Sequence, residues 1–413
     1  MKSLKFNKNY IEISLSMCLF IAIIFPKLLS LGLILAILSS LIALVKKDVS
    51  FRMNKVSLLF ILLYLAYLIG VFWTQNEAQA MKYLENKMSF LLLPLTFSFV
   101  KKEKFEINLI FKSLVFSSLL SFVINICLAF KCYDFYGSIP YCFIKGHLSG
   151  DIHPTYLSFL LSIAIVSVYQ LWKTKDLQLK WGIVLFSILS LYTILLMSLS
   201  GLIFFLLIVF GFVLRMIYFS LSFKKFLIVL LTMLVLIFMF FIKTPFIKSD
   251  VEDAAKFTNE YFKSPKKFIE NASQEPSGTE TRIIMWTVSL EEFVKHPFGV
   301  GTGNIDAYLS ANLVSKNKVE FSKFQYNPHN QFLQTGLEIG LIGLLILILI
   351  LFFGIKYALL YKSVPLLVVT LSLFMNSLFE SMLQSQFGII FYPLFFLIFI
   401  AELKSRTKQT KIS

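Results

Sequence analysis

Long apolar runs recur along almost the whole chain and constrain its fold more than any other feature of the sequence. Most of them approach 20 residues, roughly the length that an α-helix needs to cross the hydrocarbon core of a bilayer. The predicted spans cover residues 11–25, 28–46, 56–74, 81–100, 106–130, 154–173, 181–199, 201–219, 225–242, 331–357, 364–380 and 387–402. The sequence therefore predicts an all-α integral membrane protein with about twelve transmembrane helices.

The composition agrees with a lipid environment. Of the 413 residues, 57% are apolar and 15% are charged, and the mean hydropathy is +0.79, whereas a soluble domain is roughly 25% charged. These values exclude a water-soluble globule, a disordered chain and a fibrous repeat. The formal net charge is +16, but the basic residues gather in short gaps between spans, as in Lys46-Lys47 and Lys101-Lys102. The positive-inside rule makes such gaps and both termini cytoplasmic, so we expect membrane lipid and not nucleic acid as the partner.

One polar segment, residues 244–328, interrupts the series of spans. It carries similar numbers of acidic and basic residues, and the topology places it on the outer side of the membrane. We therefore expect three regions: helices 1–9 in residues 1–243, the outer loop in 244–328, and helices 10–12 in 329–413. Within the loop, Ile283, Trp286, Leu290 and Phe293 recur at helical spacing, which predicts an amphipathic helix over 280–296 that lies on the membrane or caps the bundle.

Several of the rarest residues lie on segments that we predict to face the outer side of the membrane. Arg282 is the one arginine of the outer loop, and Cys132 and Cys142 share another outer segment, where an oxidising compartment permits a disulfide without requiring it. The sequence contains no motif of a metal site or of nucleotide hydrolysis, so we expect no metal and no cofactor. The chain has four histidines, all on predicted outer segments or outer helix ends: His147, His153, His296 and His329.

The tenth span opens with a segment that helix capping can interpret. Asn327 is a good N-cap and Pro328 a good first helical residue, which places His329 in the first turn. The positive helix end then favours a neutral imidazole and attracts an anion such as phosphate; the alternative is a polar residue at the lipid interface. Three glycines further along share one helical face, where a neighbouring helix can approach closely: Gly336, Gly340 and Gly343.

Several of these residues form a recognisable pattern. His329-Asn330, nine intervening residues and then Gly340-Leu341-Ile342-Gly343 resemble the signature of the O-antigen ligase and polymerase superfamily. Arg282, Trp286, Glu291 and the stretch from His296 to Asn304 also look like that family, and weaker likenesses lie at 86–94 and 153–156. The resemblance extends over most of the chain beyond residue 75. It is specific to the superfamily and does not separate its members.

The resemblance implies a C-type glycosyltransferase fold with a long periplasmic loop between helices 9 and 10, in a bacterial inner membrane. Such enzymes take a glycan from undecaprenyl diphosphate and pass it to an acceptor at the periplasmic face, without metal or nucleotide. The acceptor is a lipid A-core sugar in the ligases, another lipid-linked unit in the polymerases, and a protein hydroxyl in related oligosaccharyltransferases. We expect a ligase, and the other two reactions remain as alternatives.

The resemblance also suggests roles for individual residues. Arg282 would bind the diphosphate and His329 would act as general base or orient the acceptor, with Asn330 positioning His329 or contacting the sugar. Lys87 is a second diphosphate candidate or an interfacial lysine, and it could replace the arginine that many relatives carry where this chain has Ser198-Leu199-Ser200. Further substrate-binding candidates, each with a structural alternative, are His153, Tyr156, His296 and Glu338. A carboxylate at membrane depth, as at Glu338 and Glu380, is a functional candidate or a helix-to-helix hydrogen bond.

A transporter of lipid-linked glycans is the alternative from another class, and a structural membrane scaffold is a third. A transporter would also be a bundle with outer polar residues, but it requires neither the His329 signature nor the long outer loop. Transporters also tend to show repeated halves and helices interrupted near the midplane, and the sequence shows neither.

Overall fold

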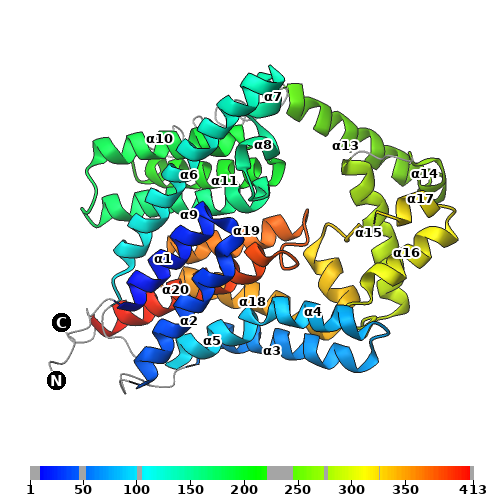
Figure 1. Ribbon diagram of the computed structural model, residues 1–413, viewed down its shortest axis with the longest axis horizontal. Coiled ribbons are helices and arrows are strands. Elements are labelled where there is room, and N and C mark those ends of the chain that lie inside the picture. The colour runs from blue at the N-terminus through cyan, green and yellow to red at the C-terminus, as the bar shows by residue number, and fades with distance from the viewer. Residues whose placement is uncertain are drawn as a thin grey trace.

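The protein folds as a bundle of α-helices, with no strand in the parts that the structure describes. The computed structural model describes residues 10–45, 53–99, 105–220, 245–273, 278–324 and 326–409, and Figure 1 shows the arrangement. The first half contains α1 (Tyr10–Ile24), η1 (Pro26–Leu28), α2 (Leu29–Val45), α3 (Lys55–Ile69), η2 (Gly70–Trp73), α4 (Glu77–Lys87), α5 (Ser89–Phe99), α6 (Ile107–Tyr136), α7 (Ile139–Cys142), α8 (Lys145–Ser149), α9 (Pro154–Lys173), α10 (Leu179–Leu195) and α11 (Leu199–Ser220). The second half contains α13 (Pro245–Lys263), α14 (Pro265–Asn271), α15 (Gly278–Lys295), α16 (Ile305–Ser315), α17 (Val319–Ser322), α18 (Gln331–Leu360), α19 (Val364–Ser377) and α20 (Gln386–Gln409).

The apolar helices identify an all-α membrane protein. Within the described ranges, five helices are long and apolar enough to cross a membrane, in α3 with η2, α6, α9, α18 and α20, and five apolar helices are shorter. All of them lie at predicted spans. The span predicted over 81–100 is wrong as one helix, because the chain forms the polar α4 and then the short α5. The span predicted over 225–242 lies outside the described residues, so the total of twelve stays a prediction.

The centre of the bundle is formed by α9 and α20. Both are buried over most of their length, and α9 packs against α6, α10, α11 and α19. The ring of Phe159 stacks on Tyr392 at 4.4 Å and meets Phe395 edge-on at 5.9 Å. A helix that is apolar all round is expected at such a position, so these two helices form the interior around which the others are arranged.

The polar segment of the sequence forms α13 to α17, which gather at one side of the bundle in Figure 1. Their small core contains Phe268, Ile284, Met285 and Val288. The predicted amphipathic helix is confirmed as α15, but its predicted apolar face is wrong because Leu290 is 53% exposed. The reason is that α15 has neighbours on several sides, α13, α16 and α18, and its buried face includes the polar residues Ser289 and Glu292.

Helix α18 is interrupted where the three predicted glycines lie. Its backbone leaves the helical conformation at Ile339 and Gly340, where φ of Gly340 is +71°, so the expectation of one continuous glycine face was wrong. The loop after α15 enters the break: the amides of Val300 and Gly301 donate to the carbonyls of Leu337 and Glu338 at 2.8 and 3.1 Å. Groups released from a helix inside an apolar bundle need such partners.

The same loop also binds the end of α3. The Thr302 hydroxyl donates to the carbonyl of Tyr67 at 2.6 Å, and its amide donates to the carbonyl of Gly70 at 3.1 Å. Asn304 continues the contact, because its Oδ1 accepts from the Thr74 hydroxyl at 2.9 Å. One glycine-rich segment therefore joins the outer helices to both α3 and α18.

We expect that Gly299 cannot be replaced by a residue with a side chain, whereas Gly211 can. The φ of Gly299 is +89°, and a Cβ there would lie 2.6 Å from the Gly340 nitrogen and 2.7 Å from the Glu338 carbonyl oxygen. Gly299→Ala should lower the free energy of unfolding by on the order of 1–3 kcal/mol, measured as a lower melting temperature in detergent. Gly211→Ala is the control, because a Cβ there meets nothing within 4 Å. Equal melting temperatures for the two variants would contradict the assignment.

Candidate active site

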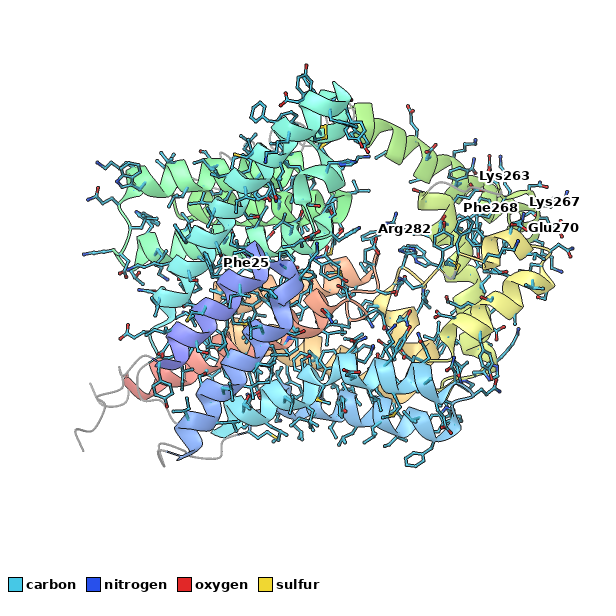
Figure 2. All side chains as sticks on the ribbon, viewed as in Figure 1. Phe25, Lys263, Lys267, Phe268, Glu270 and Arg282 are labelled. Atoms are coloured by element: carbon cyan, nitrogen blue, oxygen red, sulfur yellow. A yellow bond between two sulfur atoms is a disulfide. The ribbon has the colours of Figure 1, made fainter. Side chains whose placement is uncertain are left out.

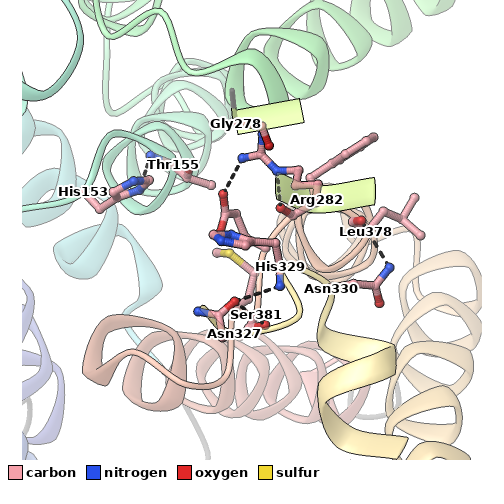
Figure 3. Close-up of polar contacts among 12 residues, drawn as sticks. His153, Thr155, Gly278, Arg282, Asn327, His329, Asn330, Leu378 and Ser381 are labelled. Atoms are coloured by element: carbon pink, nitrogen blue, oxygen red, sulfur yellow. Dashed lines mark hydrogen bonds and ion pairs between the residues drawn. The ribbon is translucent and has the colours of Figure 1, made fainter. Parts of the chain in front are cut away.

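Three ionisable side chains from separate parts of the chain meet between helices α13 to α17 and the bundle. Glu380 follows the end of α19, and its Oε1 accepts from Arg282 Nη2 at 2.8 Å. Its Oε2 lies 3.0 Å from His329 Nδ1. The Glu380 carboxylate thus bridges the two residues that the sequence marked as catalytic, and Figure 3 shows Arg282 and His329 close together.

Arg282 is placed by the first turn of α15. Its Nε donates to the carbonyl of Phe379 at 3.3 Å, and its Nη1 to the carbonyl of Gly278 at 3.4 Å. In Figure 2 Arg282 lies on the side of α15 that faces the centre of the molecule, apart from Lys263 and Lys267 at the far right. Together with the bond to Glu380, three of its five N–H donors have partners among the described residues. The remaining donors of the planar guanidinium face a cavity.

His329 lies before α18 and not in its first turn, which corrects the predicted cap. The N-cap is Asn330, whose Oδ1 accepts from the amides of Phe332 and Leu333 at 2.9 and 3.1 Å. Asn327 instead accepts from the amide of His329 at 2.7 Å, in a tight turn that gives His329 a φ of +47°. The helix end therefore does not act on His329 as expected, and the carboxylate of Glu380 is its immediate electrostatic partner.

Glu380 stays ionised at neutral pH. Burial alone would raise its pKa, but the hydrogen bond and charge of His329 and the guanidinium of Arg282 outweigh burial and hold the pKa below the usual value of 4.5. An ionised carboxylate only accepts hydrogen bonds, so Nδ1 of His329 carries the proton between them. In the neutral imidazole Nε2 then keeps its lone pair, which is the arrangement of a general base.

Arg282 and Glu380 adjoin a cavity of about 300 Å³, and His329 lies behind Glu380 and does not line it. Arg282 and Glu380 line one side, and His153, Thr155 and Ser198 line the other. Burial lowers the pKa of His153 below its usual value of 6.5, against the opposing effect of Glu380, so this side of the cavity presents a neutral imidazole. The cavity is large enough for a phosphate-bearing group, and it has the guanidinium of Arg282 and the carboxylate that contacts His329 at its wall.

Lys145 also lines this cavity, and the sequence reading missed it. It is the first residue of α8 and adopts a φ of +57°. The disulfide between Cys132 and Cys142, which the sequence left open, joins the end of α6 to α7, the helix that precedes α8. A lone lysine in a short segment between apolar spans gives no signal in the sequence, because only the fold places it and Arg282 at one cavity.

Residues 183–348 match the family model of the O-antigen ligases. Over these residues the chain is similar to the O-antigen ligases. The match includes Arg282 and His329, whereas Glu380, His153 and Lys145 lie outside it. No curated protein matches the chain.

The structure does not bring every predicted residue to the site of this O-antigen ligase domain. His296 stacks edge-on against Tyr308 at 5.0 Å and lies 3.8 Å from Glu292. Tyr156 is buried beneath the cavity, and its hydroxyl donates to the carbonyl of Met382 at 3.2 Å. Both side chains therefore have structural contacts that account for their positions.

Lys87 and Glu338 form a second polar cluster inside the bundle. Lys87 is 1% exposed and Glu338 is fully buried, and neither lines the cavity of the O-antigen ligase domain. The idea that Lys87 supplies a cation at the cavity surface gains no support from this position. Asn330 is held by its capping bonds and by donation to the carbonyl of Leu378 at 3.2 Å, which agrees with a positioning role. The described residues include no group of three His, Cys, Asp or Glu side chains that could hold a metal ion.

The stabilising effect of Glu380 should depend on pH. Its pKa in the folded protein is below 4.5, so the ionised carboxylate contributes stability at neutral pH that is lost as the pH falls through its folded-state pKa. Glu380→Gln should therefore lower the free energy of unfolding at pH 7 by on the order of 1 kcal/mol, measured as a lower melting temperature in detergent, and the difference from wild type should shrink toward pH 4. Glu320→Gln is the control, because its pair with Lys323 is exposed. A difference that does not change with pH would contradict the ion pair.

Proposed function

We propose that the chain is a glycosyltransferase that moves a glycan from undecaprenyl diphosphate to a lipid A-core acceptor. One observation carries this proposal: Glu380 joins His329 Nδ1 and Arg282 at the wall of a cavity. Transfer from a lipid diphosphate needs a base for the acceptor hydroxyl and a cation for the leaving group. The cluster offers both within one set of contacts.

In the proposed reaction, His329 activates the acceptor. Glu380 orients the ring so that Nε2 accepts the proton of the acceptor hydroxyl while that oxygen bonds to the anomeric carbon of the donor sugar. The bond between this carbon and the diphosphate oxygen breaks, and its electron pair leaves with the diphosphate. Glu380 also stabilises the imidazolium that forms, as a carboxylate does in a catalytic triad.

Arg282 is proposed to bind the diphosphate. Its unused N–H donors can form charge-assisted bonds to phosphate oxygens, which strengthen as negative charge develops on the leaving group. Lys145 adds a second positive charge at the same cavity. These two cations replace the Lys87 candidate as the proposed anion-binding pair, and no step of the reaction requires a metal ion.

The location and the acceptor belong to the proposal as well. We place the cavity at the periplasmic face of a bacterial inner membrane, with both termini in the cytoplasm and residues 244–328 as the periplasmic loop. A polymerase or a protein O-oligosaccharyltransferase would use the same donor chemistry and differ in the acceptor. A transporter of lipid-linked glycans would need neither a base nor its carboxylate partner, so the Glu380 contacts favour an enzyme.

Replacing the base or the cation should abolish most of the transfer. His329→Ala should lower turnover by about 10²- to 10⁴-fold and Arg282→Ala by about 10²- to 10³-fold. The assay follows transfer by the purified protein from an undecaprenyl diphosphate glycan to lipid A-core. His147→Ala is the matched control, because His147 is exposed and lies against Tyr141 outside the cavity.

Cells distinguish the three acceptors. A strain without the gene should hold full-length glycan on the lipid carrier and bare lipid A-core, and the wild-type gene should reverse this, whereas His329→Ala should not. Single units on the core would indicate a polymerase, and loss of glycosylated protein alone an oligosaccharyltransferase. A normal pattern with His329→Ala at equal protein level would refute the catalytic role and favour a transporter.

A further inference from the structure

A buried ammonium group lies under the candidate active site. Lys87 ends α4, and its Nζ lies 4.7 Å from the ring centroid of Tyr67 and 4.9 Å from that of Tyr83. It donates to Oε1 of Gln384 at 2.9 Å. A charge buried in a protein interior is costly unless partners compensate it, and these aromatic faces and the amide oxygen are such partners. The tyrosines and the burial keep Lys87 away from the cavity.

Gln384 passes this interaction on to a carboxylate. A lysine ammonium can only donate, so the amide oxygen of Gln384 must face Lys87 and its NH₂ group must face away. That group donates to Oε2 of Glu338 at 3.1 Å, beside a further bond from Gln334 at 3.4 Å. The chain Lys87–Gln384–Glu338 thus links α4, α18 and the segment between α19 and α20 with one fixed orientation of the amide.

Gln384 belongs to the same turn as Glu380. The turn, residues 378–385, connects α19 to α20 and is held near His329 by Ser381, which donates to Asn327 at 3.1 Å. Its middle is held by the amide of Leu383, which donates to Oε1 of Gln331 at 2.6 Å. The bond between Lys87 and Gln384 fixes the far end, so the position of Glu380 depends on contacts at both ends of the turn.

We propose that Lys87 is a positioning residue, which acts through Gln384 on turn 378–385 and so sets Glu380 against His329 and Arg282. Lys87 does not contact the diphosphate. The inference rests on the proposed transferase function and adds to it a connection from the interior of the bundle to the carboxylate of the site. Because a misplacement of about 1 Å can cost on the order of 10²-fold in rate, loss of the connection should lower kcat and leave the donor KM unchanged.

A double-mutant cycle tests the connection. Lys87→Met and Gln384→Met should each lower kcat by about 10- to 100-fold, and the double variant should lose no more than the worse single variant, because both break one chain of contacts. Lys87→Met should also have no further effect in a Glu380→Gln background. Lys82→Met is the control, since Lys82 lies on the same helix and is exposed. Multiplying losses, or a raised donor KM with kcat unchanged, would overturn the proposal and indicate direct contact with the donor.

Hydrogen exchange tests the same inference without turnover. Lys87→Met should increase the exchange of backbone amides in residues 378–385, whereas exchange in α15 should stay as in wild type and show that the fold is retained. Gln384→Met, which removes the acceptor for Lys87 and the donor to Glu338, should give the same pattern. Unchanged exchange in the turn would overturn the positioning role. The exchange experiment tests the positioning role independently of turnover. A protein without transferase activity would refute the proposed function and leave this test valid.

Discussion

Backbone amides and carbonyls inside an apolar bundle must find partners, and the interruption of α18 makes that requirement decisive here. The carbonyls of Leu337 and Glu338 accept from Val300 and Gly301, so the loop that follows α15 is fixed to the middle of α18. Arg282 at the start of α15 and His329 before the start of α18 are therefore carried by elements that are joined to each other. That backbone pairing, together with the contacts of Thr302 and Asn304 to the end of α3, fixes helices α15 and α16 to the bundle.

Glu380 connects the two candidate catalytic residues that this framework holds in place. Its two carboxylate oxygens contact residues from two other segments, Arg282 and His329, and the balance of burial and positive charge keeps it ionised. The same carboxylate thereby fixes the proton on His329 Nδ1 and limits how Arg282 can move. The proposed base and cation suit transfer from a diphosphate, and the similarity of residues 183–348 to the O-antigen ligases agrees with that chemistry.

Sequence reasoning reached the helical membrane class and the amphipathic helix α15, and it singled out Arg282 and His329, which the structure brings together through Glu380. It failed where a residue's role depends on a distant partner. The predicted N-cap at Asn327 was wrong. The N-cap is Asn330, because its side chain accepts from the first amides of α18. Lys87 was assigned to the outer surface from its place next to an apolar run, whereas the turn at 378–385 and two tyrosines enclose it.

The sequence by itself determined that this is a helical membrane protein, because long apolar runs in lipid satisfy their backbone hydrogen bonds as α-helices. It also determined which rare side chains could do chemistry, since their types and spacing are visible along the chain. Only the tertiary structure decided which of them meet: Arg282, His329 and Glu380 are far apart in sequence, and Lys145 reaches the cavity through a disulfide-linked segment. Hydrophobic burial is encoded locally, residue by residue, whereas a site built from several helices depends on packing contacts between segments that no local pattern records.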